Sequence, residues 1–269
     1  MYKIGYNGII LQGEMMKNII FFDIDNTLID TNNKEIPSQT LKLLEELSAR
    51  DDYYLGIATG RGPGRLDVIK DIIHYFDAFI CSNGSYVKFK DLVIHDHYFE
   101  NNQIERIIKV AEKFDLLVGV SGMTEDAILR KPFEKIGHLK NTAQLIPKYY
   151  LENKVYQTWL ASNNHLHLDQ AVELLPDFDH YFWTNLGVDL TINDHSKGSG
   201  ILQIKEILEP IRVICIGDGH NDIDMIEVAD IGVAMGNTRF NALKEKADYI
   251  GPHVSDNLLY EFLKKNNII

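Results

Sequence analysis

The chain of 269 residues carries 27 basic and 39 acidic side chains, which gives a formal net charge of −12. This balance argues against a nucleic-acid partner or an anionic membrane surface, because both need basic patches. No apolar run approaches the length of a membrane-spanning helix, and Cys81 and Cys215 lie in apolar runs typical of buried free thiols in a reducing cytoplasm.

The first residues, MYKIGYNGIILQGEMMKNII, lack the basic start and apolar core of a signal peptide. Residues 12–14, Gln-Gly-Glu, match what a purine-rich ribosome-binding sequence would encode if it were read through from an upstream start. We therefore expect natural translation to begin at Met15 or Met16, and residues 1–16 to lie outside the fold.

The next segment alternates between strands and helices. Apolar runs predict strands over 18–25, 53–58 and 77–81, and the helical patterns between them cover 37–50 and 64–74. Strands that alternate with helices of this length imply right-handed βαβ units on a parallel sheet.

The pattern changes after Gly84. It predicts a hairpin over 86–99, and residues 123–150 show no clear pattern. Further helices are expected over 101–114 and 168–175, and strands over 116–121, 154–161, 180–184 and 188–192. From Ser196 the alternation returns, with helices over 197–208, 222–228, 238–245 and 256–265 and strands over 211–216, 231–234 and near 249.

The predicted fold class is therefore α/β, with a doubly wound parallel-sheet core of the Rossmann-like kind. Residues 17–84 and 193–269 would form this core, and residues 85–192 would form an inserted α+β cap domain. Hinge motion is expected near 84–86 and 192–196, where the chain would pass between the two parts.

Small polar and acidic residues gather at the predicted carboxyl ends of the parallel strands. Open α/β sheets bind ligands in the crevice outside these ends, so the residues point to one site. They are Asp23 and Asp25 in FFDIDNTLID, Thr59 and Gly60 in ATGR, Asn83 in CSNG, and Asp218 in CIGDGHND.

Two carboxylates at one strand end repel each other unless a positive charge lies between them. Mg²⁺ prefers oxygen ligands and takes a few carboxylates together with water and phosphate. The glycine-rich loop GDGHND, residues 217–222, supplies further oxygens, so Asp23, Asp25 and Asp218 are expected to surround one hard cation.

Lys197 follows Ser196, a good N-cap residue, and so falls in the first turn of a predicted helix. A cation opposes the helix dipole there. A solvated surface lysine is one interpretation. The functional interpretation is that Lys197 turns inward and neutralises an anionic intermediate or a substrate phosphate.

These groups suit phosphoryl transfer. Asp23 is ionised at neutral pH and can attack phosphorus without an activating base, once a cation removes the repulsion between the two anions. Thr59 and the following amides can hold phosphoryl oxygens, and Lys197 can offset their charge. Asp25 lies two residues after Asp23, so it could protonate the leaving oxygen and then activate water.

From Lys17 onward the chain resembles the haloacid dehalogenase-like superfamily, and more narrowly its Cof-type sugar-phosphatase branch with a large α+β cap. DIDNT at 23–27 resembles the first motif of that superfamily. The resemblance implies that Asp23 is the nucleophile and that Asp25 is the acid/base and a metal ligand through its backbone carbonyl. Asn26 departs from the glycine usual in this branch, but asparagine tolerates unusual backbone angles.

The other motifs follow in order. TGR at 59–61 is similar to the second motif, with Thr59, Gly60 and Arg61 as candidate phosphate-binding residues. Lys197 matches the lysine of the third motif, and GDGHND matches the fourth. The resemblance implies that Asp218 binds the metal directly and that Asn221 and Asp222 lie close to the metal, the phosphate or Lys197. The candidate metal ligands are therefore Asp23, Asp25, Asp218 and Asp222.

The resulting hypothesis is a Mg²⁺-dependent phosphatase that hydrolyses a small phosphorylated metabolite through an aspartyl-phosphate. Sugar phosphates are the leading substrate class, followed by pyridoxal phosphate or a nucleotide such as FMN. A phospho-acceptor signalling module, or a phosphotransferase or mutase, would use the same aspartate and stays open.

Some signals stay ambiguous. His95 and His97 flank Asp96, and His165 and His167 share the same spacing. Each pair could suit zinc if it lay on a strand, but exposed or packing histidines are the favoured interpretation. Arg61 and Arg65 could contact a substrate phosphate or pair with acidic residues of the cap. Trp159 could pack in the core or stack on a sugar.

Overall fold

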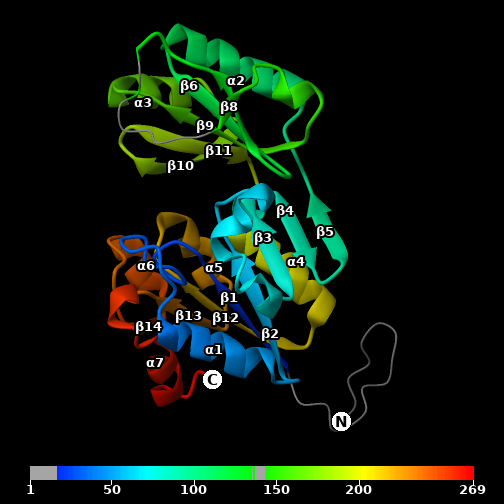
Figure 1. Ribbon diagram of the computed structural model, residues 1–269, viewed down its shortest axis with the longest axis vertical. Helices are drawn as coiled ribbons and strands as arrows, with labels where there is room; N and C mark the ends of the chain where they lie inside the picture. The colour runs from blue at the N-terminus through cyan, green and yellow to red at the C-terminus, as the bar shows by residue number, and fades with distance from the viewer. Residues whose placement is uncertain (1–16, 135, 137–142) are drawn as a thin grey trace.

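The computed structural model describes residues 17–134, 136 and 143–269, and the expectation for residues 1–16 lies outside this part of the chain. Within these ranges two sheets occupy the two ends of an elongated molecule (Figure 1). The larger sheet has the strand order β14-β13-β12-β1-β2-β3-β4-β5, and the smaller has the order β10-β11-β9-β6-β7-β8. None of the helices described there has the length and apolar character needed to cross a bilayer.

The centre of the larger sheet is apolar on both faces. Within β1 (Lys17–Phe22), Ile20 and Phe22 pack into the hydrophobic cluster on one face, and Ile19 and Phe21 pack into the cluster on the other. A parallel strand covered on both sides needs such a continuous apolar run. The strand ends at Phe22, so the two aspartates of the opening motif follow it and lie beyond the sheet.

Helices cover both faces of this core sheet, which confirms the doubly wound α/β architecture. The parallel strands that flank β1 are β2 (Tyr53–Ala58), β3 (Ala78–Cys81), β12 (Ile211–Gly217), β13 (Ile231–Ala234) and β14 (Tyr249–Ile250). One face is covered by α1 (Ser38–Ser48) and α7 (Leu259–Lys265), and the other by α4 (Lys197–Leu208), α5 (Ile223–Glu227) and α6 (Asn241–Lys246). Cys81 and Cys215 are both buried and free.

The α-helix predicted over 64–74 is wrong. This segment forms two short 3₁₀ helices, Pro63–Ile69 and Ile73–Tyr75. Arg65 leaves helical geometry with φ −113° and ψ 21°. At Gly64 the backbone lies against the backbone of Thr124, where an added Cβ would come within 2.4 Å, so this close contact shapes the turn.

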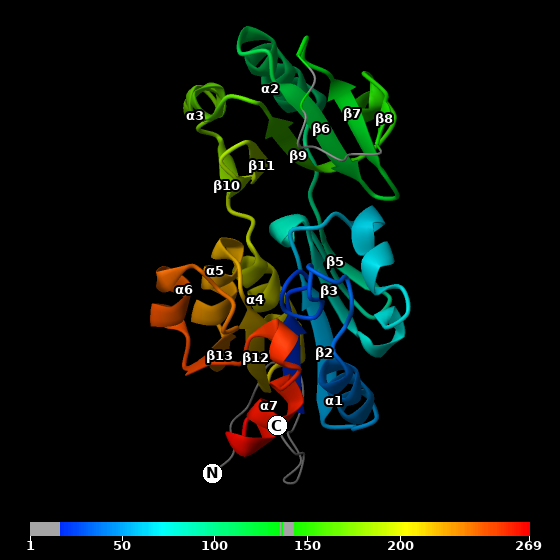
Figure 2. The ribbon, with the colours of Figure 1, turned by 60° about the vertical axis from the view of Figure 1, so that its left-hand side comes forward.

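The hairpin of β4 (Tyr86–Phe89) and β5 (Leu92–Asp96) pairs antiparallel with β3 and extends the core sheet. The sequence interpretation had assigned it to the inserted cap, because antiparallel pairing differs from the βαβ pattern before it. We therefore propose that the chain crosses into the cap over residues 97–100 and returns over 193–196 (Figure 2).

The smaller sheet carries its helices on the side away from the core (Figure 1). These helices are α2 (Asn101–Lys113) and α3 (His165–Glu173). The strands are β6 (Leu117–Gly122), β7 (Asp126–Arg130), β8 (Gln144–Leu145), β9 (Val155–Ala161), β10 (Phe178–Thr184) and β11 (Gly187–Ile192). The uncovered face of this sheet is turned toward the core, and β7 and β8 occupy part of the segment that showed no pattern in the sequence.

Candidate active site

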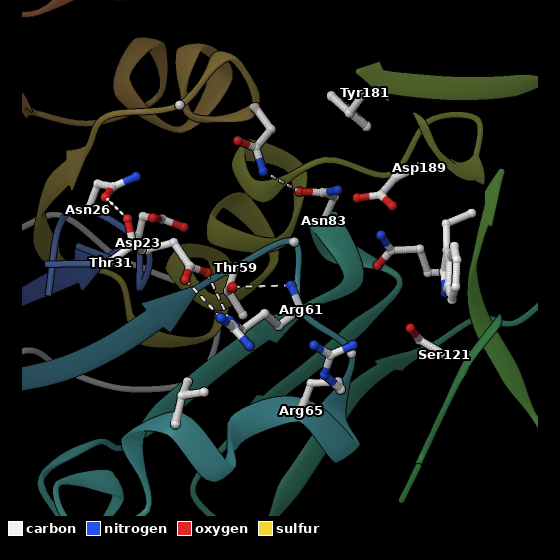
Figure 3. Close-up of a pocket in the computed structure, with 18 of the residues that line it drawn as sticks. Asp23, Asn26, Thr31, Thr59, Arg61, Arg65, Asn83, Ser121, Tyr181 and Asp189 are labelled. Atoms are coloured by element: carbon white, nitrogen blue, oxygen red, sulfur yellow. Dashed lines mark hydrogen bonds and ion pairs between the residues drawn. The ribbon is translucent and has the colours of Figure 1, made fainter. Parts of the chain in front are cut away.

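The carboxyl ends of the core strands meet at one cleft of about 1620 Å³ between the core and the cap (Figure 3). Asp23 follows β1, Thr59 follows β2, Asn83 follows β3, and Asp218 follows β12, and all four line the cleft. The parallel register therefore brings together residues that lie up to 195 positions apart, from Asp23 to Asp218.

Lys197 lies beneath this cleft with its side chain turned inward. Ser196 caps α4 by accepting a hydrogen bond from the amide of Ser199, which fixes Lys197 in the first helical turn. The Lys197 ammonium is fully buried and donates to Asp23 Oδ1 at 2.7 Å and to Asp222 Oδ1 at 2.5 Å. Such a buried cation is tolerated because two carboxylates surround it.

Asp23, Asp218 and Asp222 form an acidic cluster in which each offers an oxygen within 4.8 Å of the others. Asp222 is fully buried, and its Oδ2 accepts from the amides of Asp218 at 2.9 Å and Gly219 at 2.7 Å. It fits against Gly217, where a Cβ would come within 2.5 Å of the Asp222 carboxyl carbon. Asp222 thus shapes the GDGHND loop and positions Lys197, while Asp23 and Asp218 line the cleft itself.

Burial and mutual repulsion change the protonation of this cluster. Burial, followed by the charges of Asp222, Asp218 and Asp25, raises the pKa of Asp23 well above its ordinary value, although Lys197 acts in the opposite direction. Burial and Asp222 raise the pKa of Asp218 to about 7. Burial alone would lower the pKa of Lys197, but Asp222 and Asp23 outweigh it and raise that pKa.

The charges at the site favour a bound divalent cation. Four carboxylates meet two cationic side chains, so the fully ionised group carries two excess negative charges. The available donors are carboxylate oxygens, which Mg²⁺ prefers, and the excess charge matches one such ion. The six side chains are those of Asp23, Asp25, Asp218, Asp222, Arg61 and Lys197.

Mg²⁺ should stabilise the protein more at alkaline than at acidic pH. Asp218 has its pKa raised from 3.8 to about 7 by folding, so the stability it contributes is present below the pKa of the unfolded chain. That stability is lost as the pH rises through the folded pKa, where ionisation would also give the carboxylate that a bound Mg²⁺ needs. Thermal unfolding with and without Mg²⁺ should show a larger gain in Tm at about pH 8 than at about pH 5.5. An equal gain at both pH values would contradict Asp218 as a ligand.

The Asp25 carboxylate is not part of the acidic cluster and pairs with Arg61 instead. Arg61 donates from Nε to Asp25 Oδ2 and from Nη2 to Oδ1, both at 2.8 Å (Figure 3). Arg65 forms an ion pair with Asp126 of the cap. Arg61 thus pairs with an acid of the core and Arg65 with an acid of the cap, and a metal bond from Asp25 would have to come from its backbone carbonyl.

The candidate phosphate-binding residues lie together at the adjacent strand ends. The Thr59 hydroxyl accepts from the amide of Arg61 at 3.1 Å. Asn221 donates from Nδ2 to Asn83 Oδ1 at 2.9 Å, and a Cβ on Gly60 would lie 3.3 Å from that Asn221 nitrogen. Amide and hydroxyl groups therefore converge at one point of the cleft wall.

The structure adds Asn237, which the sequence interpretation missed. Asn237 donates from Nδ2 to Asp218 Oδ2 at 3.2 Å and to the carbonyl of Asn26 at 2.9 Å, and its Oδ1 accepts from the amide of Val254. It follows β13, so the strand-end pattern that singled out Asp218 could have found it. Asn26 has φ 60°, in line with its expected tolerance of unusual backbone angles.

The uncovered face of the cap sheet forms the opposite wall of the cleft. Trp159 lies across Gly119, where a Cβ would come within 2.0 Å of the indole ring. The side chains on this wall include aromatic and hydrogen-bonding groups. They include Gln157 and Trp159 from β9. Figure 3 labels three others, which are Ser121 from β6, Tyr181 from β10 and Asp189 from β11.

Comparison with known families gives a match over most of the chain. A model of the haloacid dehalogenase-like hydrolases matches residues 20–263. The Bacillus subtilis protein YkrA, named as a candidate phosphatase, is 32% identical over 252 residues, covering 90% of this chain and 95% of the relative.

Two further relatives extend this comparison. The pyridoxal phosphate phosphatase YbhA of Escherichia coli is 24% identical over 275 residues, which cover 91% of this chain and 97% of that protein. Among solved structures, a sugar phosphatase of HAD subclass IIB has a TM-score of 0.79 and 24% identity, over 94% of this chain and 100% of the other. At this identity the structural likeness shows a shared fold.

Proposed function

Because this chain belongs to the haloacid dehalogenase-like hydrolase family, we propose that it is a Mg²⁺-dependent phosphatase of small phosphorylated metabolites that works through an aspartyl-phosphate on Asp23. The observation that carries this proposal is the position of Asp23, which lines the cleft while Lys197 holds its Oδ1 at 2.7 Å. The phosphatase names of YkrA and YbhA support the same class of reaction.

In the first step, Asp23 attacks the phosphorus of the substrate. Lys197 engages Oδ1, so Oδ2 is the oxygen available to form the new bond, and the bond from phosphorus to the leaving oxygen breaks. Asp23 and Asp218 would hold Mg²⁺, and a bound Mg²⁺ would supply positive charge that offsets the repulsion between carboxylate and phosphate. Lys197 offsets the negative charge at Oδ1, the other carboxylate oxygen of Asp23.

Asp25 is the candidate general acid and base. Both of its oxygens accept hydrogen bonds from Arg61, so one of these bonds has to open before Asp25 donates a proton to the leaving oxygen. In the second step the Asp25 carboxylate removes a proton from water, and the resulting hydroxide attacks phosphorus. Inorganic phosphate leaves and the Asp23 carboxylate is restored. Arg61, once released from Asp25, is close enough to the cleft to bind a phosphate oxygen, together with Thr59.

The cap wall favours a polyhydroxylated substrate, and sugar phosphates are therefore the leading class. Ser121 and Asp189 supply hydrogen-bonding groups in the cleft, and Trp159, which is only 6% exposed and packs with Leu117 and Ile128, lines the cleft only at its edge. The Oε1 atom of Gln157 is buried without a hydrogen-bond partner among the described atoms, so a substrate hydroxyl could satisfy it. The sugar-phosphatase structure with the same fold supports this class.

Phosphate release tests the proposed function. The full chain is incubated with an aryl phosphate and with a panel of hexose phosphates, pyridoxal phosphate and FMN, with Mg²⁺ and with chelator. We expect release that depends on Mg²⁺, with the highest kcat/KM among the sugar phosphates. Absence of release from the whole panel in the presence of Mg²⁺ would overturn the phosphatase proposal, and a preference for pyridoxal phosphate or FMN would overturn the sugar assignment alone.

A further inference from the structure

Three histidines meet where the chain passes between the core and the cap, and none of them lines the cleft described above. His95 lies on β5, His97 is the first residue of the outgoing crossing, and His195 lies on the returning crossing. Each offers a ring nitrogen, and these nitrogens lie within 4.8 Å of one another. The fold thus joins three imidazoles from two chain segments that are about 100 residues apart in sequence.

The rings face one another closely. His97 Nδ1 lies 2.5 Å from His195 Nε2, and the ring centroid of His195 lies 4.7 Å from the centroids of both His95 and His97. The Nε2 atom of His95 is buried without a hydrogen-bond partner among the described atoms. A buried ring nitrogen without a partner costs free energy, and a ligand that accepted its lone pair would remove that cost.

The protonation of the cluster suits metal binding, because metals bind the neutral imidazole. Burial, reinforced by His95 and His97, lowers the pKa of His195 to about 4, and burial and His97 lower the pKa of His95. Asp96, the acidic residue between His95 and His97, already accepts hydrogen bonds from Lys154 and Tyr156.

We propose that His95, His97 and His195 form a binding site for a zinc-type divalent cation, which clamps the two crossings of the cap hinge to the core sheet. Zinc bound to nitrogen at about 2.0–2.1 Å places its ligand nitrogens about 3.3 Å apart. Each ring offers a nitrogen within 4.8 Å of the others, and His97 Nδ1 is hydrogen-bonded to His195 Nε2 at 2.5 Å, so a metal that took both of these nitrogens would replace this hydrogen bond. His97 is exposed, which leaves a path for the ion and a fourth position for water.

The expected consequence is control of cap movement. A cation on all three rings would tie β5, the outgoing crossing and the returning crossing at one point. His195 also lies two residues before Lys197, so the same ion would fix the start of α4. This site consists of nitrogen donors and is therefore chemically distinct from the oxygen-rich cluster that suits Mg²⁺.

Co²⁺ absorption tests the site directly in the full chain, prepared without an oligohistidine tag and with Mg²⁺ in excess to occupy the acidic cluster. A tetrahedral nitrogen site gives strong visible bands, whereas oxygen ligands in octahedral geometry give weak ones. We expect strong bands at one Co²⁺ per chain, lost when Zn²⁺ is added. His97→Gln should weaken binding by at least about tenfold, and the control His165→Gln, an exposed histidine of α3, should leave it unchanged.

Hydrogen exchange tests the clamp. Zn²⁺ should slow exchange of the amides in 97–100 and 193–196 in the wild type and in His165→Gln, but not in His97→Gln. Weak octahedral bands only, or equal Co²⁺ affinity in the two variants, would overturn the site. Tight binding with unchanged exchange at both crossings would overturn the clamp.

Discussion

Replacing Asp23 by asparagine is expected to lower kcat by at least about 10⁴-fold while the protein stays folded. The amide has nearly the same shape as the carboxylate but cannot attack phosphorus. Burial raises the pKa of Asp23, which means that its charge is costly to bury. A neutral asparagine removes that cost, so Tm measured without Mg²⁺ should be equal to or higher than that of the wild type.

Asp30→Asn is the matched control for this variant. Asp30 is also buried and lies in the same loop, but its Oδ1 accepts from the backbone and side chain of Asn32. We expect its kcat to stay within about threefold of the wild type, since it makes no contact with the reacting groups. If both variants lose activity to a similar extent, the Asp23 substitution acts by disturbing the loop and not by removing a nucleophile.

Replacing Lys197 by methionine should destabilise the protein by about 3–5 kcal/mol and lower kcat by about 10²–10³-fold. Methionine keeps the length and removes the charge, so Asp23 and Asp222 lose the cation that both contact. Two buried carboxylates then repel each other without compensation. Urea unfolding at neutral pH measures the first effect, and steady-state kinetics below the unfolding temperature measures the second.

Lys205→Met provides the comparison on the same helix. Lys205 is partly exposed and lies 3.5 Å from Asp230, so its pair is worth at most about 1 kcal/mol. It makes no contact in the cleft, and its kcat should equal that of the wild type. If Lys197→Met unfolds at the same urea concentration as Lys205→Met, the ion pairs of Lys197 with Asp23 and Asp222 do not contribute the predicted free energy of unfolding.

The sequence predicted which residues meet at the cleft better than it predicted the details of the fold around them. Asp23, Asp218 and Lys197 could be found because each is chemically out of place, an acid ending an apolar strand or a cation at a helix start. These anomalies depend on local pattern alone. Asn237 was missed because an asparagine after a strand is common in turns, and only the structure shows that it contacts Asp218.

Long-range contacts explain most of the remaining differences. The segment after Pro63 has helical periodicity, yet it forms 3₁₀ turns, and Gly64 within it lies against the backbone of Thr124, a contact between distant parts of the sequence. The strand β8 (Gln144–Leu145) is only two residues long and has no periodicity to detect. His97 contacts His195 because the outgoing and returning crossings lie side by side. The spacing of residues along the sequence does not predict this contact.

The most direct measurement of the central claim is mass spectrometry of the phosphoenzyme. Asp25→Asn, which keeps the shape of the proposed acid and base, is mixed with Mg²⁺ and an aryl phosphate and quenched in acid. An aryl leaving group needs little protonation, so Asp23 should be phosphorylated while its hydrolysis is slow. We predict one added phosphoryl group on the peptide that contains Asp23 in Asp25→Asn, and rapid loss of that group in the wild type.

A long-lived phosphoaspartate in the wild type would indicate a phospho-acceptor. Wild-type phosphate release with no phosphoryl group on that peptide in either protein would contradict Asp23 as the nucleophile.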